Sequence, residues 1–173
     1  MTGTKKRNTR RKNKMKRKLY LAYGSNMSIE QMAVRCPDAK LAGFAKINDY
    51  RLMYKGSKTG AYATIEPEKG KYVPVVVWEI SNRDEANLDM YEGYPTFYYK
   101  KHLEVEIENN GNYLGKHRAM VYIMDERRKH GIPTTYYENI LREGYRRFEF
   151  DSNLLDEALI YTAQHVYGKK MVK

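Results

Sequence analysis

The sequence contains a single cysteine, Cys36, among its 173 residues, so it cannot form an intramolecular disulfide. It also lacks any apolar run near the roughly 18 residues that a membrane-spanning helix needs. The N-terminus has no apolar segment of the kind that signal peptides carry. These absences exclude a disulfide-stabilised scaffold and a helical membrane protein, and they favour a reducing cytoplasm as the location of the chain.

Metal-binding patterns are absent as well. The sequence has four histidines, at positions His102, His117, His130 and His165, and their spacing is not typical of metal ligands. Cys36 has no motif histidine to activate it, which makes it a poor candidate for a catalytic nucleophile. We therefore predict neither a metal site nor a cofactor.

Acidic residues are missing from residues 1–18, which hold ten of the 32 lysines and arginines. The rest of the chain carries 22 basic residues against 21 acidic ones, so the net charge of +11 belongs mainly to this terminal run. We predict that residues 1–17 form a disordered basic tail, because so charged a segment cannot bury a core. The tail could make weak electrostatic contact with nucleic acid or an anionic membrane, or it could be only a solubilising extension.

Residues 18–173 are predicted to form a single domain, because 42% of the sequence is hydrophobic and 13% aromatic. Strand-like segments follow one another at hairpin spacing, at 18–23, 40–46, 50–54, 62–65, 72–80, 98–108 and 114–124. A turn at Asn48-Asp49 is expected between the second and third of them. Helical patterns are fewer, at 28–35, 83–91, 133–147 and 154–166. This order predicts an α+β fold with a mostly antiparallel, barrel-like mixed sheet of about six strands and helices packed outside.

The stretch "KLYLAYGSNM", residues 18–27, ends a buried strand in three residues suited to a turn, Gly24-Ser25-Asn26. A helix-like segment, "SIEQMAVRC", follows directly. A tight strand-to-helix turn points several backbone N–H groups at one place, and a helix N-terminus adds partial positive charge. The turn is therefore predicted to bind a small anion.

Two more motifs follow along the chain, "VVVWEI" at 75–80 and "LDMYEGYP" at 88–95. With "AYGSNM" at 22–27, they make residues 19 to about 150 resemble the gamma-glutamyl cyclotransferase family, in the order and approximate spacing of its motifs. The resemblance implies the fold of that family and its reaction. The α-amine of a γ-glutamyl compound attacks its own γ-carbonyl, and 5-oxoproline leaves with a free amine, amino acid or peptide. No metal, cofactor or enzyme nucleophile is implied.

The resemblance also implies roles for individual residues. Glu92 matches the catalytic glutamate of the family, which we expect to act first as general base and then as general acid. The Gly24-Ser25-Asn26 turn is expected to hold the α-carboxylate of the substrate. The family places a tyrosine six or seven residues after the glutamate, and here both positions are tyrosine. The substrate-binding residues implied are Tyr23, Gly24, Ser25, Asn26, Tyr136 and either Tyr98 or Tyr99.

The sequence leaves several alternatives open. Asp89 is interpreted as structural, and Glu66 is a weaker candidate for a second pocket carboxylate. The same fold could instead bind an acidic small molecule or nucleic acid without turnover. The leaving group could belong to an amine, to a crosslinked ε-(γ-glutamyl)-lysine or to an antibiotic intermediate. We expect its contacts in the loops Gly56–Gly60 and Asp125–Gly131.

Overall fold

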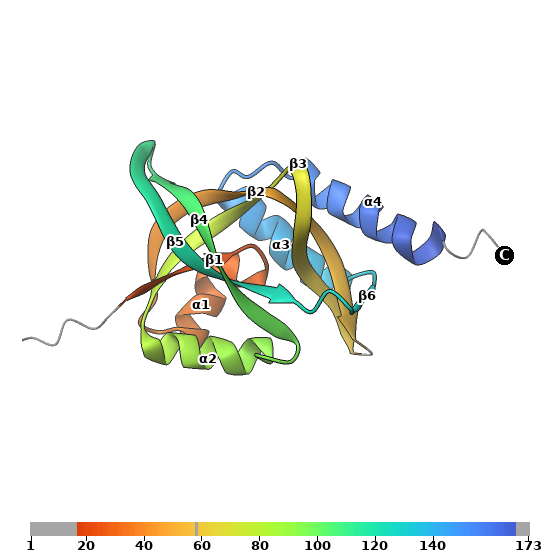
Figure 1. The fold of residues 1–173 in the computed structure, drawn as a ribbon, viewed down its shortest axis with the longest axis horizontal. Helices are drawn as coiled ribbons and strands as arrows, with labels where there is room; N and C mark the ends of the chain where they lie inside the picture. The colour runs from red at the N-terminus through yellow and green to blue at the C-terminus, as the bar shows by residue number, and fades with distance from the viewer. Residues whose placement is uncertain (1–16, 58, 169–173) are drawn as a thin grey trace, which may run out of the picture.

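The computed structural model describes residues 17–57 and 59–168, which fold into one sheet with helices beside it (Figure 1). The strands in this part of the chain are β1 (Lys18–Ala22), β2 (Lys40–Ser57), β3 (Gly60–Ile80), β4 (Tyr98–Asn109), β5 (Asn112–Met124) and β6 (Lys129–His130). The helices are a short 3-10 helix, η1 (Ser25–Met27), and the α-helices α1 (Ile29–Arg35), α2 (Asn82–Glu92), α3 (Thr135–Arg147) and α4 (Asn153–Tyr167).

The sheet has the strand order β3-β1-β5-β4-β2-β6, and a further pairing between β2 and β3 closes it into a ring. All pairings are antiparallel except that of β1 with β5. The ring is not a complete barrel, because β1–β5 and β2–β4 each pair at one position, Tyr20↔Met120 and Phe44↔Glu108. The predicted α+β class with a mostly antiparallel mixed sheet is confirmed.

Strands β2 and β3 are longer than the sequence predicted. The predicted turn at Asn48-Asp49 is wrong, because residues 40–57 form one continuous strand with a β-bulge at this point. Asp49 has a φ of 59°, and its Oδ1 accepts a hydrogen bond of 2.9 Å from the N–H of Gly70 on the opposite strand. A bulge bends a strand pair without ending it, so turn-forming residues here mark a bend. The long pair can then curve together, as Figure 1 shows.

The helix boundaries follow from their capping residues. The Ser28 side chain caps α1, and Ser81 begins α2 in a capping box with Asp84. Gly93 ends α2 in the left-handed conformation, with a φ of 63°. These local signals make Glu92 the last residue of α2, where its side chain can leave the helix surface.

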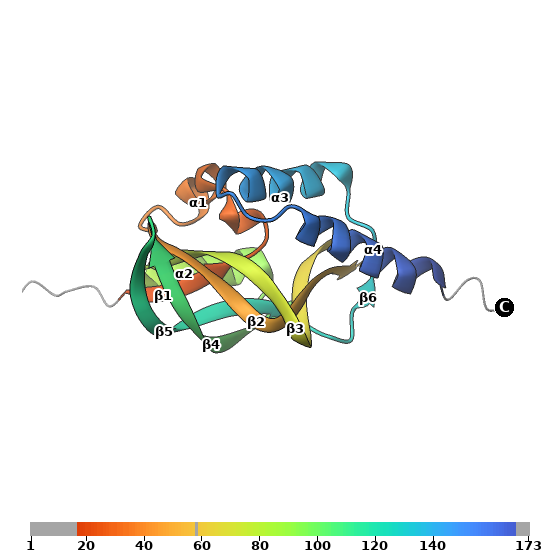
Figure 2. The ribbon, with the colours of Figure 1, turned by 90° about the horizontal axis from the view of Figure 1, so that it is seen from above.

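The core lies inside the ring of strands and under the helices. Its fully buried side chains include Leu21, Val76, Leu88 and Leu141, and burial of each such side chain stabilises the fold by about 1.5–3 kcal/mol. Helices α1, α3 and α4 lie along one side of the sheet (Figure 2). This arrangement confirms the prediction that helices pack outside the sheet.

The predicted basic tail lies outside the described residues except for Arg17, so its disorder and its nucleic-acid contact stay predictions. Arg17 donates a 2.7 Å hydrogen bond to the carbonyl of Asp38 and lies 3.3 Å from a carboxylate oxygen of Glu79. Arg17 therefore contacts the domain that is predicted to begin at residue 18. In the part of the chain that the structure describes, no helix is both long and apolar enough to cross a membrane.

Candidate active site

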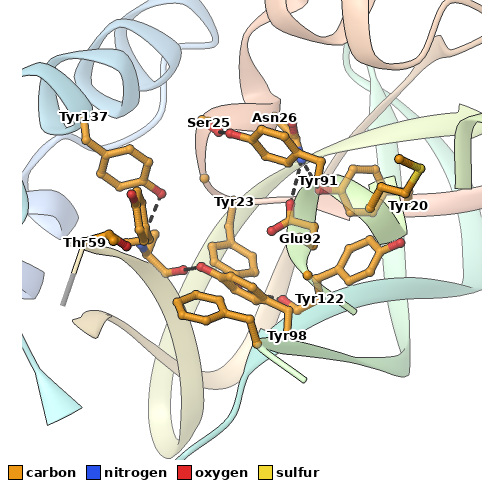
Figure 3. Close-up of a pocket in the computed structure, with 16 residues that line it drawn as sticks. Tyr20, Tyr23, Ser25, Asn26, Thr59, Tyr91, Glu92, Tyr98, Tyr122 and Tyr137 are labelled. Carbon is orange, nitrogen blue, oxygen red and sulfur yellow. Dashed lines mark hydrogen bonds between the residues drawn. The ribbon is translucent and has the colours of Figure 1, made fainter. Parts of the chain in front are cut away.

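A cavity of about 490 Å³ lies between the turn after β1, the C-terminal end of α2 and the start of β4 (Figure 3). Eight of its described lining residues are aromatic, and Glu92 alone among them carries a carboxyl group or a cationic side chain. The lining comprises Tyr20, Tyr23, Gly24, Ser25, Asn26, Thr59, Tyr62, Ala63, Met90, Tyr91, Glu92, Gly93, Phe97, Tyr98, Tyr122 and Tyr137. One carboxyl group thus lies in a largely aromatic enclosure.

Two of the expected site residues lie outside the cavity, whereas Glu92, Tyr23, Gly24, Ser25, Asn26 and Tyr98 line it. Tyr99 points the other way and donates a hydrogen bond to Glu126, because successive side chains of a strand alternate between faces. The prediction for Tyr136 is not supported by the structure, because its side chain is 77% exposed. Its neighbour Tyr137 lines the cavity instead, since one residue along a helix turns the side chain by about 100°.

The Gly24-Ser25-Asn26 turn continues as η1 and is fixed by its own backbone. The N–H groups of Met27 and Ser28 bond to the carbonyls of Gly24 and Ser25, at 3.0 and 3.1 Å. The Trp78 indole donates a 2.9 Å hydrogen bond to the carbonyl of Asn26. Within this turn, the backbone N–H groups left to bind an anion are therefore those of residues 24–26.

The Ser28 side chain occupies one of the backbone donors at the N-terminus of α1. Helix α1 begins only at Ile29, and Ser28 Oγ accepts a 3.2 Å hydrogen bond from the N–H of Gln31. A capping side chain takes the place that an anion would occupy. The expectation of anion binding stays a prediction, with one fewer donor than the sequence suggested.

Gly24 is explained by close packing. A Cβ at this position would lie 3.2 Å from the hydroxyl of Tyr137, which is tighter than ordinary van der Waals contact. Its φ of −110° is accessible to any residue, so backbone strain gives no reason for glycine here. A larger side chain would push Tyr137 away from the turn and narrow the cavity.

Glu92 is held by the side chain of Asn26. The Asn26 amide donates one hydrogen bond of 3.0 Å to Glu92 Oε1 and another of 2.9 Å to the hydroxyl of Tyr20. Figure 3 shows the Glu92 carboxyl group directed at this amide. The side-chain oxygen of Asn26, Oδ1, in turn accepts a 2.6 Å hydrogen bond from Arg35. This chain of contacts fixes which way the Asn26 amide faces.

Arg35 is the cation nearest to this network among the described residues. Its guanidinium carbon lies 3.7 Å from the centroid of the Tyr91 ring. A guanidinium N–H of Arg35 also donates a 3.2 Å hydrogen bond to Ser25 Oγ. Stacking and hydrogen bonding together hold an arginine in one orientation. Arg35 therefore links the turn after β1 to the end of α2 and places positive charge behind Glu92.

Burial raises the pKa of Glu92 to about 7, although the charge of Arg35 and the hydrogen bond from Asn26 oppose the increase. Much of the surroundings of the carboxyl group is protein rather than water, which disfavours its charged form. A carboxyl group with a pKa near 7 can both accept and donate a proton at neutral pH. Glu92 thus has the property that a general acid–base residue needs.

The tyrosine hydroxyls are neutral, because burial raises the pKa values of Tyr23, Tyr98 and Tyr137 above their usual range. Tyr98 donates a 2.9 Å hydrogen bond to the carbonyl of Ala63, and Tyr23 donates one to a backbone carbonyl on β5. Tyr137 differs from them, since its oxygen accepts a 3.1 Å hydrogen bond from the N–H of Ala63. Its own O–H can therefore donate into the cavity.

The remaining carboxylates of interest have structural partners. Asp89 accepts hydrogen bonds of 2.5 Å from the Tyr122 hydroxyl and 2.8 Å from Lys100, which supports its structural interpretation. Glu66 pairs with Lys55 and does not line the cavity, so the prediction of Glu66 as a second pocket carboxylate is not supported by the structure.

Cys36 is buried, and burial raises the pKa of its thiol to about 12, which disfavours a reactive thiolate. Within residues 17–57 and 59–168, no three His, Cys, Asp or Glu side chains come together as a metal site.

Sequence reasoning missed several residues of the site, namely Tyr20, Arg35, Tyr91, Tyr122 and Tyr137. Tyr91 lies inside the motif next to Glu92 and could have been named from it. The others approach Glu92 only through the pairing of distant strands and the packing of α1 and α3. A sequence of 17 tyrosines gives no local signal that separates these from the rest.

The fold and site together define a class: a ring-like α+β sheet with one protonatable carboxyl group in a tyrosine-lined cavity. Residues 20–147 match the family described as "Gamma-glutamyl cyclotransferase, AIG2-like". The chain therefore belongs to the gamma-glutamyl cyclotransferase, AIG2-like family.

Individual relatives agree with this placement. The chain is 37% identical over 82 residues to the gamma-glutamylcyclotransferases of Bos taurus and of Homo sapiens, and the match covers 43% of this chain and 44% of each relative. A solved structure described as a gamma-glutamyl cyclotransferase has a TM-score of 0.71 at 24% identity, over 83% of this chain and 86% of that one. The structure of YkqA from Bacillus subtilis has a TM-score of 0.64 at 17% identity, and the match covers 84% of this chain and 54% of YkqA.

Proposed function

We propose that this chain is a γ-glutamyl cyclotransferase that converts a γ-glutamyl compound into 5-oxoproline and a free amine, amino acid or peptide. A bond forms between the α-amino nitrogen and the γ-carbonyl carbon of the substrate, and the bond from that carbon to the leaving nitrogen breaks. One proton passes from the attacking to the leaving nitrogen, and no water is consumed. The enzyme would be a lyase or acyltransferase in the cytoplasm, where a reduced Cys36 is expected.

Glu92 is proposed to carry this proton. The nucleophile is already tethered in the substrate, which supplies much of the advantage of proximity. An α-amine has a pKa of roughly 8 and is mostly protonated at neutral pH, so a base must remove a proton before it can attack. Glu92 would accept the proton that this nitrogen loses as the ring closes and return it to the leaving nitrogen, and the additional proton of the ammonium form would pass to water.

The turn after β1 and Tyr137 are proposed to bind the rest of the glutamyl group. The N–H groups of residues 24–26 would hold the α-carboxylate, and the Tyr137 hydroxyl next to Gly24 could donate to a substrate oxygen. Donors placed in a cavity with little water stabilise developing negative charge more strongly than they would in solution. Tyr23 and Tyr98 would shape the wall, since their hydroxyls already donate to backbone carbonyls.

The observation that carries the proposal is the Glu92 carboxyl group, held by Asn26 in an aromatic cavity with its pKa raised to about 7. Incubation of the protein with a panel of γ-glutamyl amino acids, peptides and amines, followed by detection of 5-oxoproline, tests the proposal. Turnover of any member supports it. Binding without 5-oxoproline from the whole panel would instead favour a non-catalytic binding module.

The pH dependence of kcat/KM should show an acidic limb with a midpoint near pH 7. Glu92 must be ionised to accept a proton, and burial raises its pKa to about 7, so activity should fall about tenfold per pH unit below that value. Initial rates at low substrate concentration across pH 5–8 measure this limb. A midpoint near 4.5 would mean that the essential carboxyl group is solvated and is not the one in this cavity.

Replacement of Arg35 by glutamine should move the acidic limb to higher pH. The Arg35 charge lowers the pKa of Glu92, and its removal leaves the carboxylate with less support. Arg35→Lys is the matched control, since it keeps the charge and loses the planar contact with Tyr91. The lysine variant should shift the midpoint less. An unchanged midpoint in Arg35→Gln would show that Arg35 is not coupled to Glu92.

A further inference from the structure

A second cavity adjoins the first, and Thr59 lines both. It is formed by the turn between β2 and β3 and by the segment around β6, the two loops in which the sequence placed the leaving-group contacts. Its charge is different, because Arg127, Arg128 and Lys129 line it together with one carboxylate, Asp125, whereas no described lysine or arginine lines the first cavity. Figure 3 shows Thr59 at the end of the first cavity that lies away from Glu92.

Arg128 lies at the boundary between the two cavities. Its guanidinium carbon is 3.9 Å from the centroid of the Phe97 ring, and Phe97 lines the first cavity. Its Nε is buried without a hydrogen-bond partner, and within the described residues no carboxylate lies within ion-pair distance of Arg128, although its charge helps to lower the pKa of Asp125. The adjacent Arg127 is different, because it is already bound to Asp125 at 2.5 and 2.9 Å.

The segment that carries Arg128 is fastened at both ends. The N–H of Asp125 donates a 3.1 Å hydrogen bond to the carbonyl of Phe97, and that of Arg128 donates one of 3.0 Å back to Asp125. The N–H of Gly131 bonds to the carbonyl of Tyr54 at 3.2 Å. The arginine is therefore placed before any ligand arrives, which lowers the entropy lost on binding.

We propose that Arg128 binds a carboxylate on the part of the substrate that leaves with the amine. This inference rests on the proposed cyclotransferase activity and names the substrates that it favours: γ-glutamyl amino acids or peptides with a free carboxylate. A guanidinium stacked on a ring keeps the N–H groups at its edge, where they can meet a carboxylate in two parallel hydrogen bonds. With Glu92 at the opposite end, the leaving group extends toward Thr59 and Phe97.

The cation on the Glu92 side of the first cavity cannot serve this purpose. Arg35 is bound to Asn26 and Ser25 behind Glu92, on the side of the glutamyl group. A ligand in the cavity would reach the terminal N–H groups of Arg128, because its Nε is covered by protein, and hydrogen bonds from a guanidinium to a carboxylate are among the strong ones. A γ-glutamyl amine that lacks a carboxylate would leave Arg128 unsatisfied and should bind less well.

The test compares substrates in matched pairs. γ-Glutamyl-alanine and γ-glutamyl-alanyl-glycine are each assayed beside the same compound with its C-terminal carboxylate amidated, in the wild-type protein and in Arg128→Gln. The wild type should prefer at least one free acid to its amide by tenfold or more in kcat/KM. Arg128→Gln should abolish that preference, because it should lower kcat/KM on the free acid at least about tenfold more than on the amide.

Arg127→Gln is the control, because this side chain is 90% exposed and lies in the same segment. It should keep the full preference for the acid, and Arg128→Lys should keep part of it. Equal rates on acid and amide in the wild type, or equal losses on both in Arg128→Gln, would overturn the inference and leave the proposed activity standing. No 5-oxoproline from any pair would overturn both.

Discussion

Replacement of Glu92 by glutamine should lower kcat at least about 100-fold, since general acid–base groups contribute roughly 10²–10⁴-fold. The amide is nearly isosteric, and its oxygen can still accept the hydrogen bond that Asn26 donates at 3.0 Å. What the variant loses is a group able to take and return a proton. Substrate should therefore still bind, and 5-oxoproline formation should nearly cease.

The stability of the same variant provides an internal control. The pKa of Glu92 is raised to about 7 in the folded chain, against roughly 4.3 for an unfolded glutamate. The folded chain therefore favours the protonated form of Glu92. The stability gained from this preference is fully present below about pH 4 and is lost as pH rises to about 7. Glutamine does not ionise, so Glu92→Gln should melt no lower than the wild type at pH 8.

The two measurements together separate chemistry from folding. Glu92→Asp keeps a carboxyl group one methylene further back and should retain more activity than Glu92→Gln. A glutamine variant with near-wild-type rates and an unchanged melting temperature would show that Glu92 is not the base. A loss of rate accompanied by a large fall in melting temperature would point to a structural role.

Acetylation of the substrate α-amine should abolish amine release altogether. The reaction proposed here has one nucleophile, the α-amino nitrogen, and an amide nitrogen cannot replace it. The acetylated compound should give no detectable free amine under conditions in which its parent is consumed. Chromatography of both the released amine and the glutamyl product measures the outcome.

A substrate amidated at the α-carboxylate controls for poor binding. It keeps the nucleophile and loses the charge assigned to the turn at residues 24–26. Hydrogen bonds to a charged group contribute roughly 1.5–3 kcal/mol each, so kcat/KM should fall at least about tenfold without reaching zero. Amine released from the acetylated compound, or free glutamate from the parent, would make water the nucleophile and the protein a hydrolase.

Local sequence was enough to predict the helix ends and the position of the carboxyl group. Ser28 and Ser81 cap α1 and α2 with their own side chains, and Gly93 ends α2 through a conformation that glycine readily adopts. These signals lie within a few residues of the features they determine. The family motifs act at the same short range, and they were sufficient to locate Glu92 and the turn at residues 24–26.

Local sequence was also misleading where it depended on turn chemistry. The sequence predicts a turn at Asn48-Asp49, yet these residues lie within the long pair of β2 and β3. The same backbone conformation serves a turn or a bulge, and pairing with the opposite strand decides between them. That pairing joins residues that a sequence window does not contain.

The composition of the cavity was decided by tertiary structure. Tyr98 rather than Tyr99 faces it because of the register of β4, and Tyr137 rather than Tyr136 because of the rotation of α3. Arg35 and Arg128 acquire their proposed roles only through contacts with the rings of Tyr91 and Phe97. The sequence by itself determined which carboxyl group and which turn are present, because those are encoded by neighbouring residues. The structure alone decided what surrounds them, because burial, pKa and the pairing of charges depend on segments brought together by folding.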